Sequence, residues 1–149
     1  MGFSMRFGSF FFVSLFFLVL AACSVNTTPD VSGSGPVTIL GDTGGNPYEY
    51  AALHAELKAS GRQVRLGGCN SACTMLTSLP NACLIRGTRF GFHASNLNGR
   101  FNALSAEYLT PVIRQRFLST WGKSREMTKL TAEEMVALDP ALKLCNATH

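Results

Sequence analysis

Three short segments of the sequence carry the residues that could do chemistry. They are Gly44-Gly45, the segment 68–73 (GCNSAC) and Gly91-Phe92-His93. The hydroxyl of Ser71 can act as a nucleophile once a histidine removes its proton, and His93 is the candidate general base. A glycine pair lets a backbone N–H approach a reacting group closely because no side chain blocks it. These residues therefore predict a serine hydrolase site.

Each of these signals also has a purely structural interpretation. Serine at a helix start is commonly an N-cap, a histidine at a strand end can belong to the core, and a glycine pair can form only a turn. Their order along the chain favours a site, because each lies where a strand is expected to end. In this arrangement the backbone N–H groups of Gly45 and Ala72 would form an oxyanion hole.

The elements that must position these residues are predicted from hydrophobic periodicity and turn residues. Strands are expected at 37–40, 63–66, 83–85 and 89–93, and helices at 46–61, 70–79, 105–121 and 131–138. The third helix is the longest, with apolar residues on one face (Ala106, Leu109, Ile113 and Phe117), and the last opens with a capping box at Thr131. This alternation predicts an α/β fold with a parallel sheet, whose ligand site lies beyond the carboxyl ends of the strands. Tyr48 and Tyr50, beside Gly45, are candidates for lining it.

The order of these motifs resembles the fold of Clp protease and crotonase, and most closely small exported Clp-protease-like proteins of proteobacteria. The resemblance covers about residues 37–145, and its most specific parts are Ser71-Ala72-Cys73-Thr74 and Gly91-Phe92-His93. It implies a ClpP/crotonase-like parallel-sheet spiral core with flanking helices. It also implies that Ser71 is the nucleophile, that His93 is the general base, and that Gly45 and Ala72 form the oxyanion hole. Proteins of this fold assemble into rings or trimers, so a homo-oligomer is a possible state.

The third member of the triad has no clear counterpart. Clp-type peptidases place an aspartate before the late helix that resembles 131–138, and this chain has none there. Glu126 is the nearest carboxylate in sequence and is the candidate orienting acid, whereas Asp139 lies beyond the helix. Either carboxylate can equally be a surface charge, and we favour the surface role. Loss of an orienting acid lowers the rate by orders of magnitude without abolishing catalysis.

The amino terminus resembles that of a bacterial lipoprotein. An apolar stretch from Phe10 to Leu20 follows Arg6, and Ala21-Ala22-Cys23 comes next. The stretch is short for a permanent membrane span and suits a signal peptide of residues 1–22. In lipoproteins the cysteine at this place is acylated, so Cys23 would anchor the protein in the cell envelope, facing the periplasm and most plausibly at the outer membrane. Residues 23–36 then read as a flexible tether and 37–149 as a single small domain.

Cysteine usage agrees with an exported protein. Besides Cys23 there are four cysteines, at positions 69, 73, 83 and 145, an even number that predicts two disulfides with the pairing left open. A metal site is disfavoured because the spacing is CxxxC, and no cofactor motif is present. The net charge is +4 with the basic residues scattered singly, which disfavours a nucleic-acid partner.

Two functions of different classes follow from the sequence. In the first, Ser71, His93 and Glu126 hydrolyse a peptide, an amide or an ester at the cell envelope. In the second, the domain is a catalytically inactive binding or assembly lipoprotein, and Ser71 is only a helix cap. The residues around Ser71 and His93 favour the first, although whether the chain is an enzyme stays open at this point.

Overall fold

The structure is a computed structural model that describes residues 29, 31–95 and 99–146. The predictions for the signal peptide and for Cys23 lie outside the described residues. Within the described part of the chain, no helix combines the length and the apolar character needed to cross a membrane.

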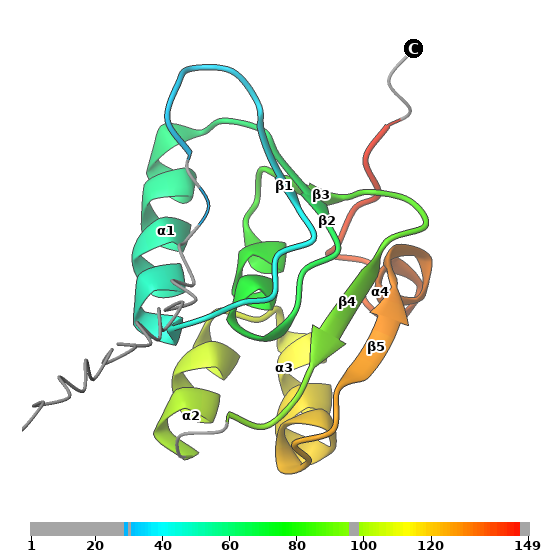
Figure 1. Cartoon of the computed structure of the whole chain (residues 1–149). Helices are drawn as coiled ribbons and strands as arrows, with labels where there is room; N and C mark the ends of the chain where they lie inside the picture. The colour runs from blue at the N-terminus through cyan, green and yellow to red at the C-terminus, as the bar shows by residue number, and fades with distance from the viewer. Residues whose placement is uncertain (1–28, 30, 96–98, 147–149) are drawn as a thin grey trace, which may run out of the picture.

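A small parallel sheet forms one half of the fold (Figure 1). Its strands are β1 (Val37–Leu40), β2 (Val64–Gly67) and β3 (Ala82–Leu84), in the order β1-β2-β3. Helix α1 (Pro47–Ser60) connects the first two strands, and the 3-10 helix η1 (Ser71–Ser78) connects the second and third. The register pairs Val37 with Val64 and Val64 with Ala82. The predicted α/β class with a parallel sheet is confirmed for these strands.

A second, antiparallel pair of strands corrects the expectation of a purely parallel sheet. Strand β4 (Arg89–Phe92) pairs with β5 (Thr128–Thr131), which the sequence did not predict. Strand β5 is only four residues long and none of its residues is fully buried, so it lacks the apolar alternation by which strands are recognised. Its last residue, Thr131, is also the N-cap of helix α4 (Ala132–Leu138), so the helix signal masked the strand.

The expected long helix at 105–121 is wrong, because the chain forms two helices there. They are α2 (Gly99–Glu107) and α3 (Pro111–Ser119), followed by the short 3-10 helix η2 (Trp121–Lys123). Proline disfavours the helical conformation in the residue before it, and Thr110 accordingly has a ψ of 155°. Proline then suits the first position of α3. The apolar face was nevertheless read correctly, since all four of its residues are buried (Ala106, Leu109, Ile113 and Phe117).

The helix ends follow their sequence signals. The Asn46 side chain accepts a hydrogen bond from the N–H of Tyr48, Pro47 begins α1, and Gly61 ends it with a φ of 64°. At α4, the Thr131 hydroxyl accepts from the Glu134 N–H while the Glu134 carboxylate accepts from the Thr131 N–H. The predicted capping box is thereby confirmed.

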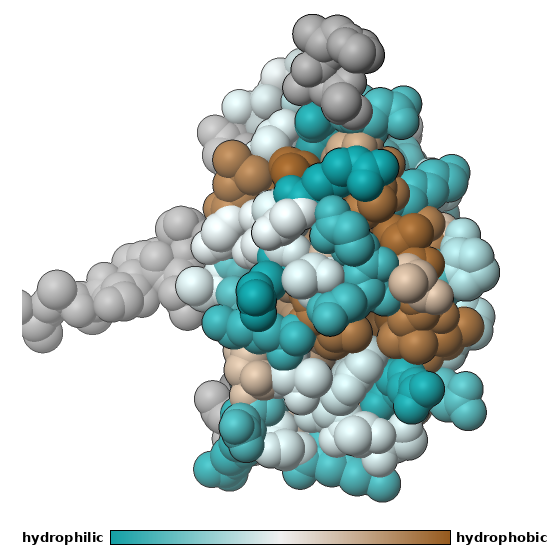
Figure 2. Space-filling view, turned by 90° about the vertical axis from the view of Figure 1, so that its right-hand side faces the viewer, coloured by the Kyte–Doolittle hydropathy of each residue, from teal (hydrophilic) through white to brown (hydrophobic). Residues whose placement is uncertain are grey.

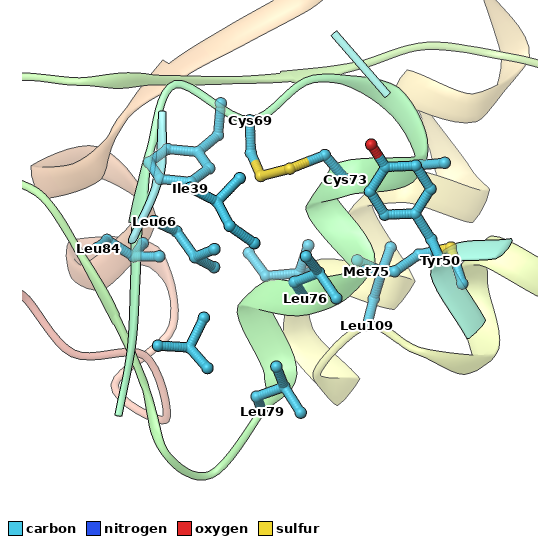
Figure 3. Packing of buried hydrophobic residues seen from close by; sticks show 14 of the residues in the cluster. Ile39, Tyr50, Leu66, Cys69, Cys73, Met75, Leu76, Leu79, Leu84 and Leu109 are labelled. Carbon is cyan, nitrogen blue, oxygen red and sulfur yellow. A yellow bond between two sulfur atoms is a disulfide. The ribbon is translucent and has the colours of Figure 1, made fainter. Parts of the chain in front are cut away.

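One hydrophobic core joins these elements, and η1 runs through it with six of its eight residues buried. Figure 3 shows its side chains packed with Ile39 and Leu66 of the sheet and with Tyr50 of α1. Figure 2 shows the face on the side of β4 and β5, where hydrophobic residues form separate groups among hydrophilic ones. The nucleophile candidate thus stands at the start of the most deeply buried helix.

The four described cysteines form two disulfides, Cys69–Cys73 and Cys83–Cys145. The second closes a segment 62 residues long in sequence and, by the chain-entropy argument, stabilises the fold by about 4 kcal/mol. The first spans only 4 residues, and the same argument gives about 2 kcal/mol, so its main effect is local. Two disulfides indicate an oxidising compartment outside the cytoplasm.

Candidate functional site

Ser71 is placed by a sharp turn between β2 and η1. Its φ is +52°, and it is the one non-glycine residue with a positive φ among those that the structure describes. This left-handed conformation costs a residue with a side chain roughly 1–2 kcal/mol. A strained serine at a strand-to-helix turn, with its hydroxyl exposed at the sheet edge, is the geometry of a nucleophile elbow. The strain therefore points to a functional role for this residue.

The Cys69–Cys73 disulfide encloses Ser71 and holds this turn. The two cysteines are 1% and 0% exposed, and their Cα atoms lie 5.3 Å apart. Inside the same loop the Cys73 N–H donates to the Asn70 carbonyl at 3.1 Å. In Figure 3 the disulfide lies at the start of η1, with Ile39 to one side and Tyr50 to the other. The backbone at Ser71 is thus fixed from inside the core.

Gly44 packs closely against the backbone of the turn that holds Ser71. A Cβ atom at position 44 would lie 2.5 Å from the Asn70 carbonyl oxygen and 2.9 Å from the Ala72 nitrogen, so no other residue fits without displacing backbone. The sequence singled out the glycine pair, and the structure shows that Gly44 needs to be glycine. Its φ of +80° adds to that requirement.

Asp42 ties the glycine loop to the serine turn. Its Oδ1 accepts hydrogen bonds from the Gly44 N–H at 2.7 Å and from the Tyr50 hydroxyl at 2.6 Å, and its carbonyl accepts from the Asn70 N–H at 2.9 Å. Burial, followed by the bond to Asp42, raises the pKa of Tyr50 well above its usual value, so the phenol stays a donor. Tyr50 therefore holds the glycine loop through Asp42. Of the two tyrosines expected to line the ligand site, only Tyr48 lines the cavity described below.

Two backbone N–H groups at this junction are left available. Within the described residues, neither the Gly45 N–H nor the Ala72 N–H donates to a protein acceptor. Both belong to segments that Asp42 and Gly44 hold together. They are the two groups that the sequence assigned to an oxyanion hole, and free N–H donors are what such a hole requires.

Strand β4 brings His93 to the same place. The Gly91 N–H donates to the Cys69 carbonyl at 2.9 Å, and Asn70 and Gly91 form a parallel bridge. A Cβ atom at Gly91 would collide with the Asn70 side chain and would lie 2.5 Å from the Met127 sulfur, so these two side chains pack directly on the glycine. His93, two residues further along, is half-buried.

Ser71, His93, Gly44 and Gly45 line one cavity of about 610 Å³. The rest of its wall comes from the start of α1, from β4 and from the region of α2 and α3, elements that Figure 1 shows gathered at one end of the molecule. In the described structure Ser71 and His93 share this cavity without a hydrogen bond between them, and the Ser71 hydroxyl has no protein partner. Such bonds commonly tighten only when substrate is present.

The carboxylates near His93 in sequence lie elsewhere. Glu126 is exposed and does not line the cavity, and its N–H donates to the Ser124 hydroxyl. Asp139 is 2% exposed and accepts from the Thr110 hydroxyl and, at 2.9 Å, from the Ala141 N–H, so it stabilises the end of α4. The carboxylate that does line the cavity is Glu49, which sequence reasoning missed. Its signal was its position in the first turn of the helix after Gly45.

A second serine–histidine pair lies on the far side of α1. Nε2 of His54 is 3.2 Å from the Ser78 hydroxyl oxygen, which also donates to the Tyr108 carbonyl at 2.6 Å. Burial, and then the nearby Lys58, lower the pKa of His54 below its usual value of 6.5. His54 is half-buried and in hydrogen-bond contact with Ser78, so it belongs to the packing between α1 and η1.

No group of three or more metal-ligating side chains is found in the part of the chain that the structure describes.

The sequence matches no protein-family model and no curated protein.

Proposed function

We propose that this protein is a serine hydrolase of the cell envelope, which cleaves an ester, an amide or a peptide bond. The observation that carries the proposal is the backbone of Ser71: a φ of +52° inside a disulfide loop, with its free hydroxyl in a cavity that His93 shares. A protein retains such strain where the surrounding structure over-determines it, which is typical of functional sites. The proposal includes a ClpP/crotonase-like arrangement of the core.

In the proposed reaction the Ser71 Oγ attacks the carbonyl carbon of the substrate while His93 takes the hydroxyl proton. The negative charge that develops on the carbonyl oxygen is stabilised by the N–H groups of Gly45 and Ala72. The bond to the leaving group then breaks, and His93 gives its proton to that group. Water repeats the sequence on the acyl-enzyme, so that the acid is released and Ser71 is regenerated.

The proposal places this chemistry at a membrane through a lipid on Cys23. The two disulfides support an oxidising compartment, and a lipoprotein with a cleaved signal peptide of residues 1–22 is the form that the sequence predicts for it. The sequence predicts residues 23–36 as the tether between the lipid and the domain. Arg62 donates hydrogen bonds to the carbonyls of Val31 and Gly35, both at 2.6 Å, and Val31 packs against the core, so the described end of this segment lies on the domain. A homo-oligomer is compatible with this arrangement, and nothing in it calls for a nucleic acid.

A catalytically inactive binding or assembly lipoprotein is the second candidate. In that case Ser71 would serve only as a helix cap. The geometry gives this role little support, because Asn70 occupies the N-cap position of η1 and the Ser71 hydroxyl accepts no hydrogen bond from the helix N–H groups described.

Labelling with a fluorophosphonate probe tests the proposal on the oxidised, full-length mature protein. We expect one covalent adduct, located on Ser71 by peptide mass spectrometry, which Ser71→Ala abolishes and which His93→Ala slows by about a hundredfold or more. Ser78→Ala is the matched control, since Ser78 is the serine that lies beside a histidine without lining the cavity. A folded, oxidised protein that takes no label, or takes it at Ser78, would overturn the proposal.

The role of Glu126 is settled by the same assay. As the acid that orients His93, Glu126 would be needed for labelling, and Glu126→Gln would lower the rate by about a hundredfold or more. As a solvated surface charge, which its exposure favours, it would change the rate by less than about twofold.

A further inference from the structure

Part of the cavity wall is apolar and largely aromatic. It is built by Phe92 of β4, Phe101 of α2, Phe117 of α3 and Leu109 between these two helices. Tyr48, at the start of α1, packs edge-on against Phe101 with ring centroids 5.8 Å apart, so the aromatic wall continues across to α1. Such a surface gains free energy when it is covered by apolar groups.

The cavity is lined by an acidic side chain and by no lysine or arginine among the described residues. Of the described residues around the cavity, only Glu49 carries a full charge at neutral pH, His93 aside, and no lysine or arginine contributes. The remaining polar groups are neutral hydroxyls and amides, such as Thr43, Asn46 and Asn102. A substrate carboxylate bound here would therefore meet the Glu49 carboxylate, and no lysine or arginine among the described lining residues would pair with it.

We infer that the cavity accepts acyl groups that are apolar and carry no negative charge, and that Glu49 is the residue that excludes carboxylate-bearing ones. This inference rests on the proposed hydrolase function, because it concerns the acyl group that Ser71 would receive. Glu49 is exposed at the rim, so its effect acts on the charge of the substrate and is screened by salt. The apolar wall favours longer acyl chains over shorter ones.

A matched pair of esters tests the inference: p-nitrophenyl hexanoate and the mono-p-nitrophenyl ester of glutaric acid, which have acyl chains of similar length but differ in the terminal carboxylate. We expect kcat/KM for the hexanoate to exceed that for the glutarate by about tenfold or more, and hexanoate to exceed acetate by a similar factor. Added salt should reduce the ratio of kcat/KM between hexanoate and glutarate, and should leave the ratio between hexanoate and acetate unchanged. Fluorophosphonate titration counts the active Ser71 sites independently of either ester.

Two variants assign the preference to residues. Glu49→Gln should raise kcat/KM for the glutarate by about threefold while leaving the hexanoate unchanged, and Glu56→Gln, an exposed glutamate on the same helix outside the cavity, should change neither. Phe101→Ala should lower the hexanoate rate by about tenfold and leave acetate unaffected. Labelled Ser71 with equal rates on both esters overturns this inference and spares the hydrolase. No label on Ser71 overturns both.

Discussion

Two serine–histidine pairs are found in the part of the chain that the structure describes, and the pair with the shorter distance is not the one that lines the cavity. Ser78 and His54 lie 3.2 Å apart, whereas Ser71 and His93 share a cavity without a direct bond. The close pair joins α1 to η1 and to the Tyr108 carbonyl, so it holds helices together. The separated pair lies where the chain ends two strands and begins a helix.

The comparison shows that free groups identify a site better than short distances do. The Ser78 hydroxyl has two carbonyl acceptors for its single proton, that of Tyr108 at 2.6 Å and that of Met75 at 3.3 Å, besides its contact with Nε2 of His54, so this serine is fully partnered within the fold. Among the described residues, the Ser71 hydroxyl has no protein partner, its backbone has a positive φ, and the nearby N–H groups of Gly45 and Ala72 donate to no protein acceptor. A substrate that enters the cavity can bind to such hydroxyl and N–H groups, because they have no partner within the described protein.

Gly44→Ala should produce the largest change in stability and labelling rate, because it disrupts the Ser71 site while it leaves the Ser78–His54 pair intact. The new Cβ would lie 2.5 Å from backbone and the residue would keep a φ of +80°, so we expect a loss of about 2–5 kcal/mol in the free energy of unfolding, together with slower fluorophosphonate labelling. The measurement is urea unfolding combined with the labelling rate.

Gly61→Ala is its control, since Gly61 also has a positive φ, +64°, but nothing lies within 4 Å of its Cβ position. That variant should lose only about 1 kcal/mol and label normally. Equal effects of the two variants would mean that the contact between Gly44 and the serine turn has no special importance.

Ser71→Gly and Ser78→Ala should move stability in opposite directions. Glycine relieves the left-handed strain at position 71, and after allowance for its greater freedom in the unfolded chain we expect a gain of up to about 1 kcal/mol, with labelling lost. Ser78→Ala removes the partner of His54 and the bond to Tyr108, and should cost about 1–2 kcal/mol with labelling kept. Thermal unfolding of both variants measures this. A loss of stability in Ser71→Gly would show that Ser71 stabilises the fold, which is the structural role.

The smallest expected effect is a dependence of stability on pH that comes from the His54 pair. Because the folded state lowers the pKa of His54 below 6.5, the neutral ring is the stabilised form. Its contribution is present above pH 6.5 and is lost as the pH falls through the lowered pKa of the folded state. The unfolding temperature should therefore fall on acidification, and His54→Gln should reduce that fall. An unchanged profile in His54→Gln would show that His54 does not contribute.

Local signals in the sequence determined much of the framework. The β-branched run at Val37–Leu40, the Asn46-Pro47 start and Gly61 end of α1, and the capping box at Thr131 all act over a few residues, so they could be read directly. The positions of Ser71 and His93 at strand ends followed from the same reading. The cysteines predicted two disulfides, but their pairing depends on distances between distant segments.

Only the tertiary structure decided which of these groups meet. Strand β5 exists because β4 offers it a partner, and Pro111 divides the predicted long helix where the chain must turn. The positive φ of Ser71 occurs inside the Cys69–Cys73 loop, against which Gly44 packs, and the cavity is lined by residues from Thr43 to Phe117. The sequence by itself named the serine, the histidine and the glycine pair, because their types and local order carry that information. Which carboxylate joins them was a matter of packing, and packing brought Glu49 to the cavity and left Glu126 in solvent.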